Sequence, residues 1–284
     1  MTAAALALTA AVLMHVVWNL LARASRPDSR FLWWALLGYL VVVGPWSLHA
    51  LVTEAHWSLA LAGLLATSAL SNAVYFLGLG AAYRRAPVAL VYPIARSSPL
   101  LIALWSSLLF GEVIAVAGWL GILVSVGGLA LMAASAKHGD SRRALFFAVA
   151  AAFATSVYSL SNKFAVASLP TYASQLGLVS VDLTTSFIAL SIEQRIRLGG
   201  WRPPAMPPIA RWLPAGLCIG NAYGLVIFAM QYLSAAYAVA FTNAGIVLAG
   251  LLSIFAFGER EHWGTRLAAM GIITCGLAVL TFSV

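Results

Sequence analysis

The stretch VALVYPIARSSPLLIALWSSLLFGE, residues 88–112, carries one charged side chain, Arg96, before it reaches Glu112. A helix needs about twenty predominantly apolar residues to cross the hydrocarbon core of a bilayer, and this stretch supplies them. The rest of the chain is similar, because 62% of its 284 residues are apolar and only 8% are charged. A soluble domain carries about 25% charged residues. We therefore expect an all-α integral membrane protein.

Comparable apolar runs follow one another along almost the whole chain. Lipid offers no partner to unpaired backbone groups, so only helices or closed barrels span a membrane. These runs are too long for barrel strands and do not alternate in polarity. The sequence therefore predicts about ten transmembrane helices. They cover residues 3–22, 31–52, 58–82, 88–110, 113–134, 144–169, 172–192, 212–233, 235–257 and 263–283. Among the connections, only residues 193–211 offer room for extended structure.

Basic residues mark the two predicted sides of the membrane. Every lysine and arginine except Arg96 and Lys163 falls in or beside the connections that follow predicted helices 1, 3, 5, 7 and 9. Short cytoplasmic loops are enriched in these residues, which places both termini outside. The net charge of +8 is then a topology signal, and we expect membrane lipid as a partner and no nucleic acid.

The sequence also repeats itself. SNAVYFLGLGAAYRRAPVA, residues 71–89, aligns with GNAYGLVIFAMQYLSAAYA, residues 220–238, and pairs Asn72 with Asn221. Farther on, LLFGE (108–112) corresponds to FAFGE (255–259) after a shift of two residues. Two copies of one unit explain this pattern.

We predict two five-helix units, residues 1–134 and 144–284, joined by a connecting loop over 135–143. Because five is odd, the second unit enters the membrane from the opposite side. Such inverted repeats recur in secondary transporters, whose substrate sites lie near the midplane where the repeats meet.

The doubled FGE, together with HVVWNLLARAS (15–25) and APVALVYPIARSSPLL (86–101), resembles the EamA-type ten-helix members of the drug/metabolite transporter superfamily. The resemblance covers the whole chain. It implies metabolite efflux by alternating access across a bacterial inner membrane, around a central cavity lined by predicted helices 1, 3, 4, 6, 8 and 9. The second unit has FTNAGIVLAG (241–250) in place of YPIARSSPLL (92–101), and its missing prolines argue against strictly symmetric gating.

Arg96 is the most informative polar residue, because charged groups inside a membrane are costly and usually face a bundle interior or an aqueous cavity. It stands between Pro93 and Pro99, which remove backbone donors and favour an interrupted helix that lines a cavity. A guanidinium there suits the carboxylate or phosphate of a substrate. The alternatives are a structural ion pair with Asp182 and snorkelling toward the headgroups.

Asp182 lies near the middle of the seventh predicted helix. A carboxylate isolated at this depth is expected to hold a proton, which makes Asp182 a candidate for proton coupling. The alternatives are a salt bridge to Arg96 or Lys163, and a bond within its own helix. Lys163 itself is nearer the predicted outer surface, where snorkelling is expected.

Further candidates lie on the helices that the resemblance assigns to the cavity. His15, Trp18 and Asn19 share one face of the first helix through i, i+3 and i+4 spacing, and His15 is a second candidate to exchange a proton. The alternative is that such residues hold helices together. The remaining candidate substrate contacts are Tyr92 beside Arg96, and Asn72, Tyr75, Tyr158, Asn162, Asn221, Tyr223 and Asn243.

Together these aromatic and amide side chains suit a small organic solute better than an inorganic ion. An amino-acid-like, zwitterionic or anionic metabolite is favoured. No phosphate-binding loop, HExxH motif or nucleophile elbow is present in the sequence, so we expect no enzyme activity, cofactor or metal. The alternatives are a channel-like facilitator, a lipid-handling protein and a non-transporting membrane partner of an enzyme complex, each as a monomer or homodimer.

Two features are assigned structural roles. Glu112 and Glu259, in the FGE motifs, are expected to cap helices and form turns at the membrane boundaries. Gly121, Gly127 and Gly128 are expected to let the fifth helix pack closely against a neighbour.

Overall fold

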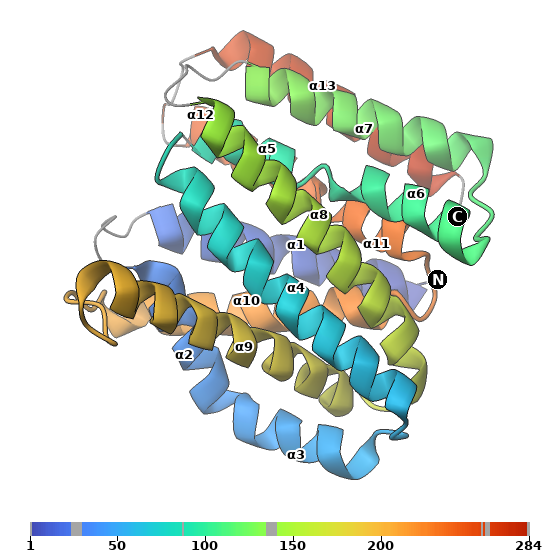
Figure 1. Cartoon of the computed structure of the whole chain (residues 1–284). Helices are drawn as coiled ribbons and strands as arrows, with labels where there is room; N and C mark the ends of the chain where they lie inside the picture. The colour runs from blue at the N-terminus through green and yellow to red at the C-terminus, as the bar shows by residue number, and fades with distance from the viewer. Residues whose placement is uncertain are drawn as a thin grey trace. The chain divides into compact units, whose positions relative to one another are not determined.

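A computed structural model of the chain describes residues 2–23, 30–86, 88–134, 141–256, 258 and 262–282. All regular structure in these residues is helical (Figure 1). The helices are α1 (Thr2–Arg23), α2 (Phe31–Val42), α3 (Gly44–Glu54), α4 (Leu59–Tyr83), α5 (Val88–Ala95), α6 (Ser98–Phe110), α7 (Val116–Ala134), α8 (Ser141–Ala165) with the 3₁₀ turn η2 (Val166–Ser168), α9 (Tyr172–Leu198), α10 (Ile209–Ala229), α11 (Ala235–Phe241), α12 (Ala244–Phe255) and α13 (Trp263–Thr281).

Within the described ranges, 9 spans are long and apolar enough to cross a membrane, and the count reaches 10 if α2 and α3 form one bent span. Each of these spans matches one of the apolar runs predicted from the sequence. The structure therefore confirms an all-α chain whose helices have the length and composition of membrane spans.

α2 and α3 meet at an angle of 57°. Pro45 stands in the first turn of α3, where it has no N–H to donate and its ring excludes the carbonyl of the residue four positions earlier. The hydrogen-bonding ladder of α2 therefore ends at Val43, and a new helix starts in a different direction.

The long connection predicted over residues 193–211 is wrong at both ends. α9 continues to Leu198 and ends on Gly199, whose φ is 78°, and α10 begins at Ile209. The last turns of α9 are polar but helical, because Glu193 pairs with Arg197 one turn on and with Arg30 before α2. Such i, i+4 ion pairs stabilise a helix.

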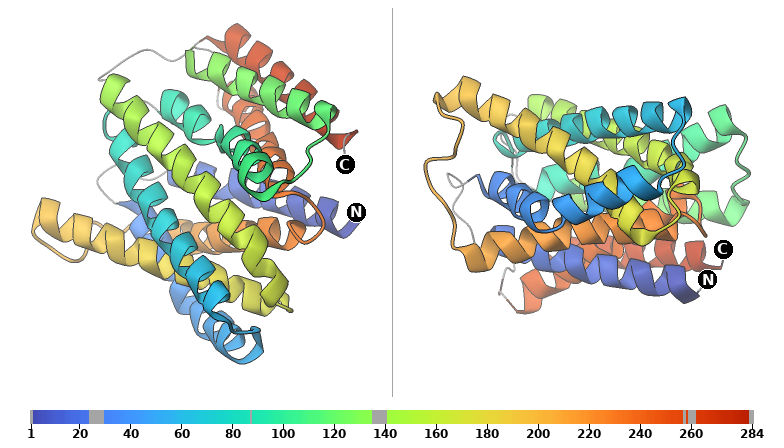
Figure 2. Two further views of the ribbon diagram at one scale, coloured as in Figure 1. Left: turned by 45° about the vertical axis from the view of Figure 1, so that its right-hand side comes forward. Right: turned by 90° about the horizontal axis from the view of Figure 1, so that it is seen from below.

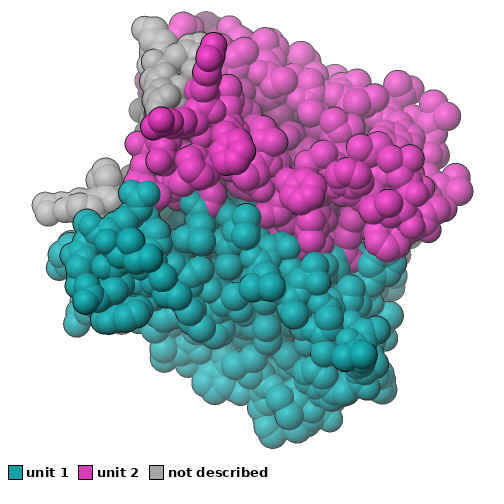
Figure 3. Space-filling view, in the orientation of Figure 1, with its two compact units in different colours: residues 1–77, 161–232 teal, residues 78–160, 233–284 magenta. Residues whose placement is uncertain are grey.

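The chain divides into two compact units, which are coloured separately in Figure 3. Unit 1 comprises residues 1–77 and 161–232, and unit 2 comprises residues 78–160 and 233–284. Each unit therefore draws helices from both halves of the sequence. The long helices α4 and α8 each run from one unit into the other.

In unit 1, α10 packs against α1 and α2, and α9 packs against α3. Glycines allow these close approaches: a Cβ added at Gly216 would overlap the Ala35 carbonyl of α2, and one at Gly177 would overlap the Ser47 carbonyl of α3. Small residues at helix contacts let two backbones approach closely. The fully buried Tyr39 lies in the core beside this seam.

In unit 2, α7 and α13 lie side by side (Figures 1 and 2). A Cβ added at Gly121 would lie 2.8 Å from the Gly276 carbonyl oxygen, and one at Gly128 would lie 2.8 Å from the Ala269 carbonyl oxygen. A Cβ added at Gly127 would meet no atom of another described helix within 4 Å. The predicted packing role is confirmed for Gly121 and Gly128 and is wrong for Gly127, because that residue points away from α13.

The glycine of each FGE motif lies in the left-handed region: φ is 66° at Gly111, the C-cap of α6, and 70° at Gly258, which lies beyond the end of α12. Glycine adopts this conformation at little steric cost. The backbone N–H of Glu112 returns to the Ser106 carbonyl at 3.0 Å, which confirms the first motif as a turn. Glu259 lies outside the described residues.

The adjacent glycines of α7 allow a matched test of this seam. Gly128→Ala should lower the stability of the detergent-solubilised protein by about 1–3 kcal/mol, because the new methyl group overpacks against the α13 backbone. Gly127→Ala should be neutral or slightly stabilising, since alanine favours helix over glycine. Thermal unfolding of both variants gives the comparison. Equal midpoints would contradict the seam.

Candidate functional site

The structure gathers buried polar side chains into two clusters, one in each unit. The first, the Asp182 cluster, belongs to unit 1 and joins four helices. Its members are Ser68 and Asn72 of α4, Asn162 of α8, Asp182 and Ser186 of α9, and Tyr223 of α10. Apart from the half-buried Tyr223, all of them are at most 3% exposed.

Two hydrogen bonds form a ladder between α4 and α9. The Ser68 hydroxyl donates to Asp182 Oδ2 at 2.8 Å, and the Ser186 hydroxyl lies 2.8 Å from Asn72 Oδ1. Both rungs join residues 114 positions apart in the sequence, and successive rungs are one helical turn apart on each helix. The two helices therefore run parallel here, in a register fixed by polar contacts.

The Asp182 carboxylate is 0% exposed and is surrounded by neutral groups. Besides Ser68, the Tyr223 hydroxyl donates to Oδ2 at 3.4 Å, and that same hydroxyl accepts a hydrogen bond from the Asn162 amide. In the described part of the chain, Asp182 Oδ1 and Asn162 Oδ1 have no hydrogen-bond partner. The alternative of a salt bridge to Lys163 is not what the structure has, because Lys163 donates to the Met230 carbonyl.

The second cluster surrounds Arg96 in unit 2, where two membrane-length spans are interrupted. The fourth span breaks between α5 and α6 at Arg96 and Ser97, as its prolines predicted. The ninth span breaks between α11 and α12 at Thr242 and Asn243, although no proline is present. The interruption therefore occurs in both sequence repeats, which the comparison of prolines did not predict.

Short-range hydrogen bonds explain both interruptions. At the first, the N–H of Ser97 bonds to the Ile94 carbonyl, and the Ser97 hydroxyl donates to the same oxygen at 2.7 Å. At the second, the Thr242 N–H and hydroxyl both reach the Val239 carbonyl, the hydroxyl at 2.6 Å. A tight i to i−3 turn replaces the α-helical pattern in each case, and a hydroxyl that competes for a backbone carbonyl favours this change.

Arg96 joins the two interruptions. Its Nη2 donates to the Thr242 hydroxyl at 2.5 Å, and the Asn243 amide donates to the Arg96 carbonyl at 3.4 Å. The guanidinium carbon lies 5.8 Å from the centre of the Tyr92 ring, within the range of a cation–π contact. Three polar atoms at the junction have no partner among the described residues: Arg96 Nε, the Ser98 hydroxyl and Asn243 Oδ1.

The three candidates on α1 contact one another. Trp18 Nε1 donates to His15 Nδ1 at 3.0 Å, and the Asn19 amide donates to the His15 carbonyl at 2.6 Å. The predicted common face is therefore present. All three side chains are half-buried.

Three other candidates have contacts of other kinds. The Asn221 amide donates to Leu217 of its own helix at 2.9 Å, so it plays a different role from Asn72, its sequence equivalent. The Tyr75 ring packs against Phe76 and the core of unit 1. Tyr158 is half-buried on the part of α8 that belongs to unit 2.

Sequence reasoning missed the hydroxyl members Ser68, Ser186 and Thr242. Their signal was available: Ser68 precedes Asn72 by one helical turn, Ser186 follows Asp182 by one turn, and Thr242 precedes Asn243 directly. Serine and threonine are common in membrane-length helices, where they often bond to their own backbone. Only a hydrogen-bond partner on another span distinguishes these three hydroxyl residues from the serines and threonines that bond only to their own backbone.

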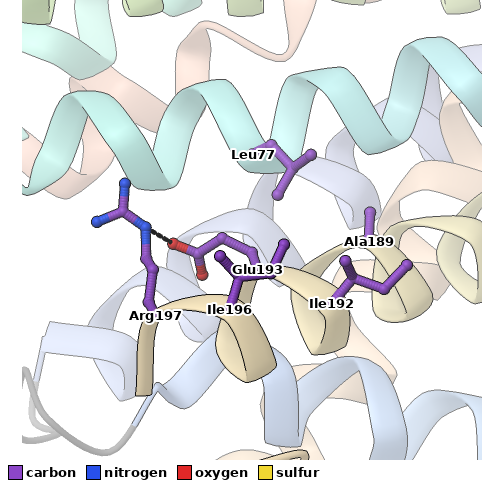
Figure 4. A pocket seen from close by; sticks show the side chains of 6 residues that line it. All are labelled: Leu77, Ala189, Ile192, Glu193, Ile196 and Arg197. Atoms are coloured by element: carbon purple, nitrogen blue, oxygen red, sulfur yellow. Dashed lines mark ion pairs between the residues drawn. The ribbon is translucent and has the colours of Figure 1, made fainter. Parts of the chain in front are cut away.

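A surface groove of about 220 Å³ lies near the end of α9 (Figure 4). Its walls are apolar side chains of α4 and α9, and the Glu193–Arg197 ion pair lies at its edge. None of the candidate substrate contacts lines it. We assign it no part in the site.

Comparisons with known proteins show the fold and no family. No family model matches the chain, and no curated protein matches it. Solved structures include 29 matching chains. One, described only as "Crystal structure of protein", is 22% identical, has a TM-score of 0.75, and covers 99% of this chain and 97% of its own. The chain thus shares the fold of that crystal structure along almost its whole length.

The repeat-related asparagines allow a matched test of the ladder. Asn72→Ala should destabilise the protein by about 1 kcal/mol, because the buried Ser186 hydroxyl loses its acceptor on α4 and keeps only the Asp182 backbone carbonyl of its own helix, 2.9 Å away. Asn221→Ala, which removes a bond within one helix, should have a smaller effect. Thermal unfolding in one detergent measures both. A larger loss for Asn221→Ala would contradict the interhelical ladder.

Proposed function

We propose that this chain is an integral membrane protein of the bacterial inner membrane and a secondary transporter that works by alternating access. Its substrate is a small organic metabolite with an anionic or zwitterionic, amino-acid-like character, and export is the favoured direction. The membrane-length helices, the internal repeat and the resemblance to EamA-type transporters support this proposal.

Helix pairing supports an inverted repeat within this proposal. The fifth helix of each sequence repeat packs against its counterpart, as α7 against α13. The fourth helices do the same through α6 and α11, and the second and seventh spans do so through α3 and α9. Two copies related by a twofold axis in the membrane plane would bring equivalent helices together in this way.

The observation that carries the proposal is the junction of the two interrupted spans at Arg96. Interrupted helices are a recurrent feature of transporter substrate sites. A guanidinium with an unused Nε–H, beside an unpartnered Ser98 hydroxyl, offers two donors of the kind that bind a carboxylate. A purely structural arginine would be expected to use its donors within the protein.

Flux measurements on the purified protein in liposomes test the transport class. Saturable uptake of labelled amino acids or small organic acids, with counterflow, is the expected result for a carrier. Flux that does not saturate would indicate a channel-like facilitator instead. Absence of flux for every metabolite class would refute both and favour a lipid-handling protein or a non-transporting membrane partner.

Arg96→Ala should weaken the binding of carboxylate ligands by ten- to one-hundredfold, because a hydrogen bond to a charged group contributes about 1.5–3 kcal/mol. Arg96→Lys should bind carboxylate ligands with intermediate affinity, since lysine keeps the positive charge but cannot form a bidentate hydrogen-bonded pair with a carboxylate. Isothermal titration or a thermal-shift series against amino acids and organic acids provides the measurement.

The matched control is Arg85→Ala. Arg85 donates to the Ala81 carbonyl at 2.7 Å and stacks over Phe147, so its loss should leave ligand affinity unchanged. Unchanged affinity in Arg96→Ala would refute the assigned role, and equal losses in both variants would point to a general effect of removing positive charge.

A further inference from the structure

The Asp182 cluster contains two buried oxygens whose hydrogen-bonding capacity is unused. Asp182 Oδ1 and Asn162 Oδ1 have no partner in the described part of the chain, and both side chains are 0% exposed. Buried polar atoms are normally hydrogen-bonded, and each exception calls for an explanation. The two side chains are neighbours, because both contact the Tyr223 hydroxyl.

An ionised carboxylate in this place would lack a counter-charge among the described residues that contact it. Its contacts are the hydroxyls of Ser68 and Tyr223 and the Asn162 side chain. Burying an isolated charge is far more costly than burying a hydrogen-bonded neutral group. A carboxyl group in such surroundings is neutralised by a proton or matched by a bound cation.

The other titratable groups of unit 1 do not change this balance. From α10, only Tyr223 faces the carboxylate, and the ammonium of Lys163 on α8 donates to Met230. On α3, Glu54 accepts a hydrogen bond from Thr171 at the beginning of α9, about three helical turns from Asp182. His49 of α3 and Tyr39 of α2 do not contact the carboxylate among the described contacts.

One proton removes the uncompensated charge. Asp182 Oδ1 has no hydrogen-bond partner among the described residues, so a proton added there displaces no existing contact. Oδ2 keeps its hydrogen bonds from Ser68 and Tyr223. A proton needs no additional space, whereas a metal cation needs several oxygens at fixed distances.

We propose that the Asp182 cluster is a proton-binding site, in which the buried Asp182 carboxyl carries the proton, and that this proton is the coupling ion of transport. The chemical step is the reversible addition of one proton to the carboxylate, with no other bond made or broken. The claim that this proton is the coupling ion (the coupling part) rests on the proposed transport function. The claim that Asp182 binds a proton (the binding part) is independent of that function.

Infrared difference spectroscopy of the purified protein tests the binding part without any transport. Wild type should show a protonated-carboxyl C=O band at neutral pH, and the isosteric Asp182→Asn should lack it. Glu112→Gln, which changes a carboxylate at a helix-ending turn, is the control and should keep the band. Asn162→Ala should shift the band, because an amide in contact with the carboxyl group is removed.

A band that is identical in wild type and Asp182→Asn would overturn the site. Sodium, lithium and potassium chloride titrations by thermal shift examine the competing cation. Stabilisation by one of these ions that disappears in Asp182→Asn would show a metal-cation site and would equally overturn the proton site.

Liposome measurements test the coupling part. A pH gradient should drive solute accumulation by wild type and by Glu112→Gln, and Asp182→Asn should lose this dependence. Dependence retained in Asp182→Asn would refute coupling through Asp182 and leave the transport function standing. Absence of flux in wild type would refute the transport function, while the infrared result would still decide whether Asp182 binds the proton.

Discussion

Backbone hydrogen bonding in apolar surroundings is the constraint on which this structure depends. Peptide groups in a medium without water must bond to one another, and the helix satisfies them within a single segment. The described spans obey this requirement over most of their length, and three departures from it bear on the architecture. Two are the interruptions at Arg96 and Asn243, and the third is the bend at Val43. At Ser97 and Thr242, side-chain hydroxyls and tight turns supply hydrogen bonds to backbone carbonyls in place of the helical ones. Backbone groups therefore stay hydrogen-bonded even where the helix is interrupted.

Close approach of backbones is the second requirement, and glycine allows it where two helices touch. Gly216 and Gly177 let α10 and α9 approach α2 and α3 in unit 1, while Gly121 and Gly128 let α7 approach α13 in unit 2. Lipid is as apolar as a leucine side chain, so burial of apolar surface adds little to helix association in a bilayer. Shape and interhelical hydrogen bonds must then hold the helices of each unit together. The Asp182 cluster and the Arg96 junction supply such hydrogen bonds.

Composition and apolar length predicted the spans well, because both follow directly from the solvent that the helices face. The ends of α9 and α10 were misplaced, since an ion pair between Glu193 and Arg197 makes a polar segment helical. Arg96 and Asp182 were found because charge in an apolar helix is conspicuous. Their partners Thr242, Ser68 and Ser186 were not, because a hydroxyl gains its role from a residue more than one hundred positions away. The interruption at Thr242 also escaped, since proline is a sufficient cause of a broken helix and not a necessary one.

The ladder between α4 and α9 has a consequence for how these helices can slide. If α9 moved by one turn, about 5.4 Å, Asp182 would face Asn72, but Ser186 would then face Phe76 and Ser68 would face Leu178. If it moved one turn the other way, Ser186 would face Ser68, while Asp182 would face Leu64 and Asn72 would face Leu190. Either displacement replaces two polar contacts with one and sets polar groups against apolar side chains. The two hydrogen bonds between α4 and α9 can therefore form together in one register only. We expect the two helices to move as one rigid body.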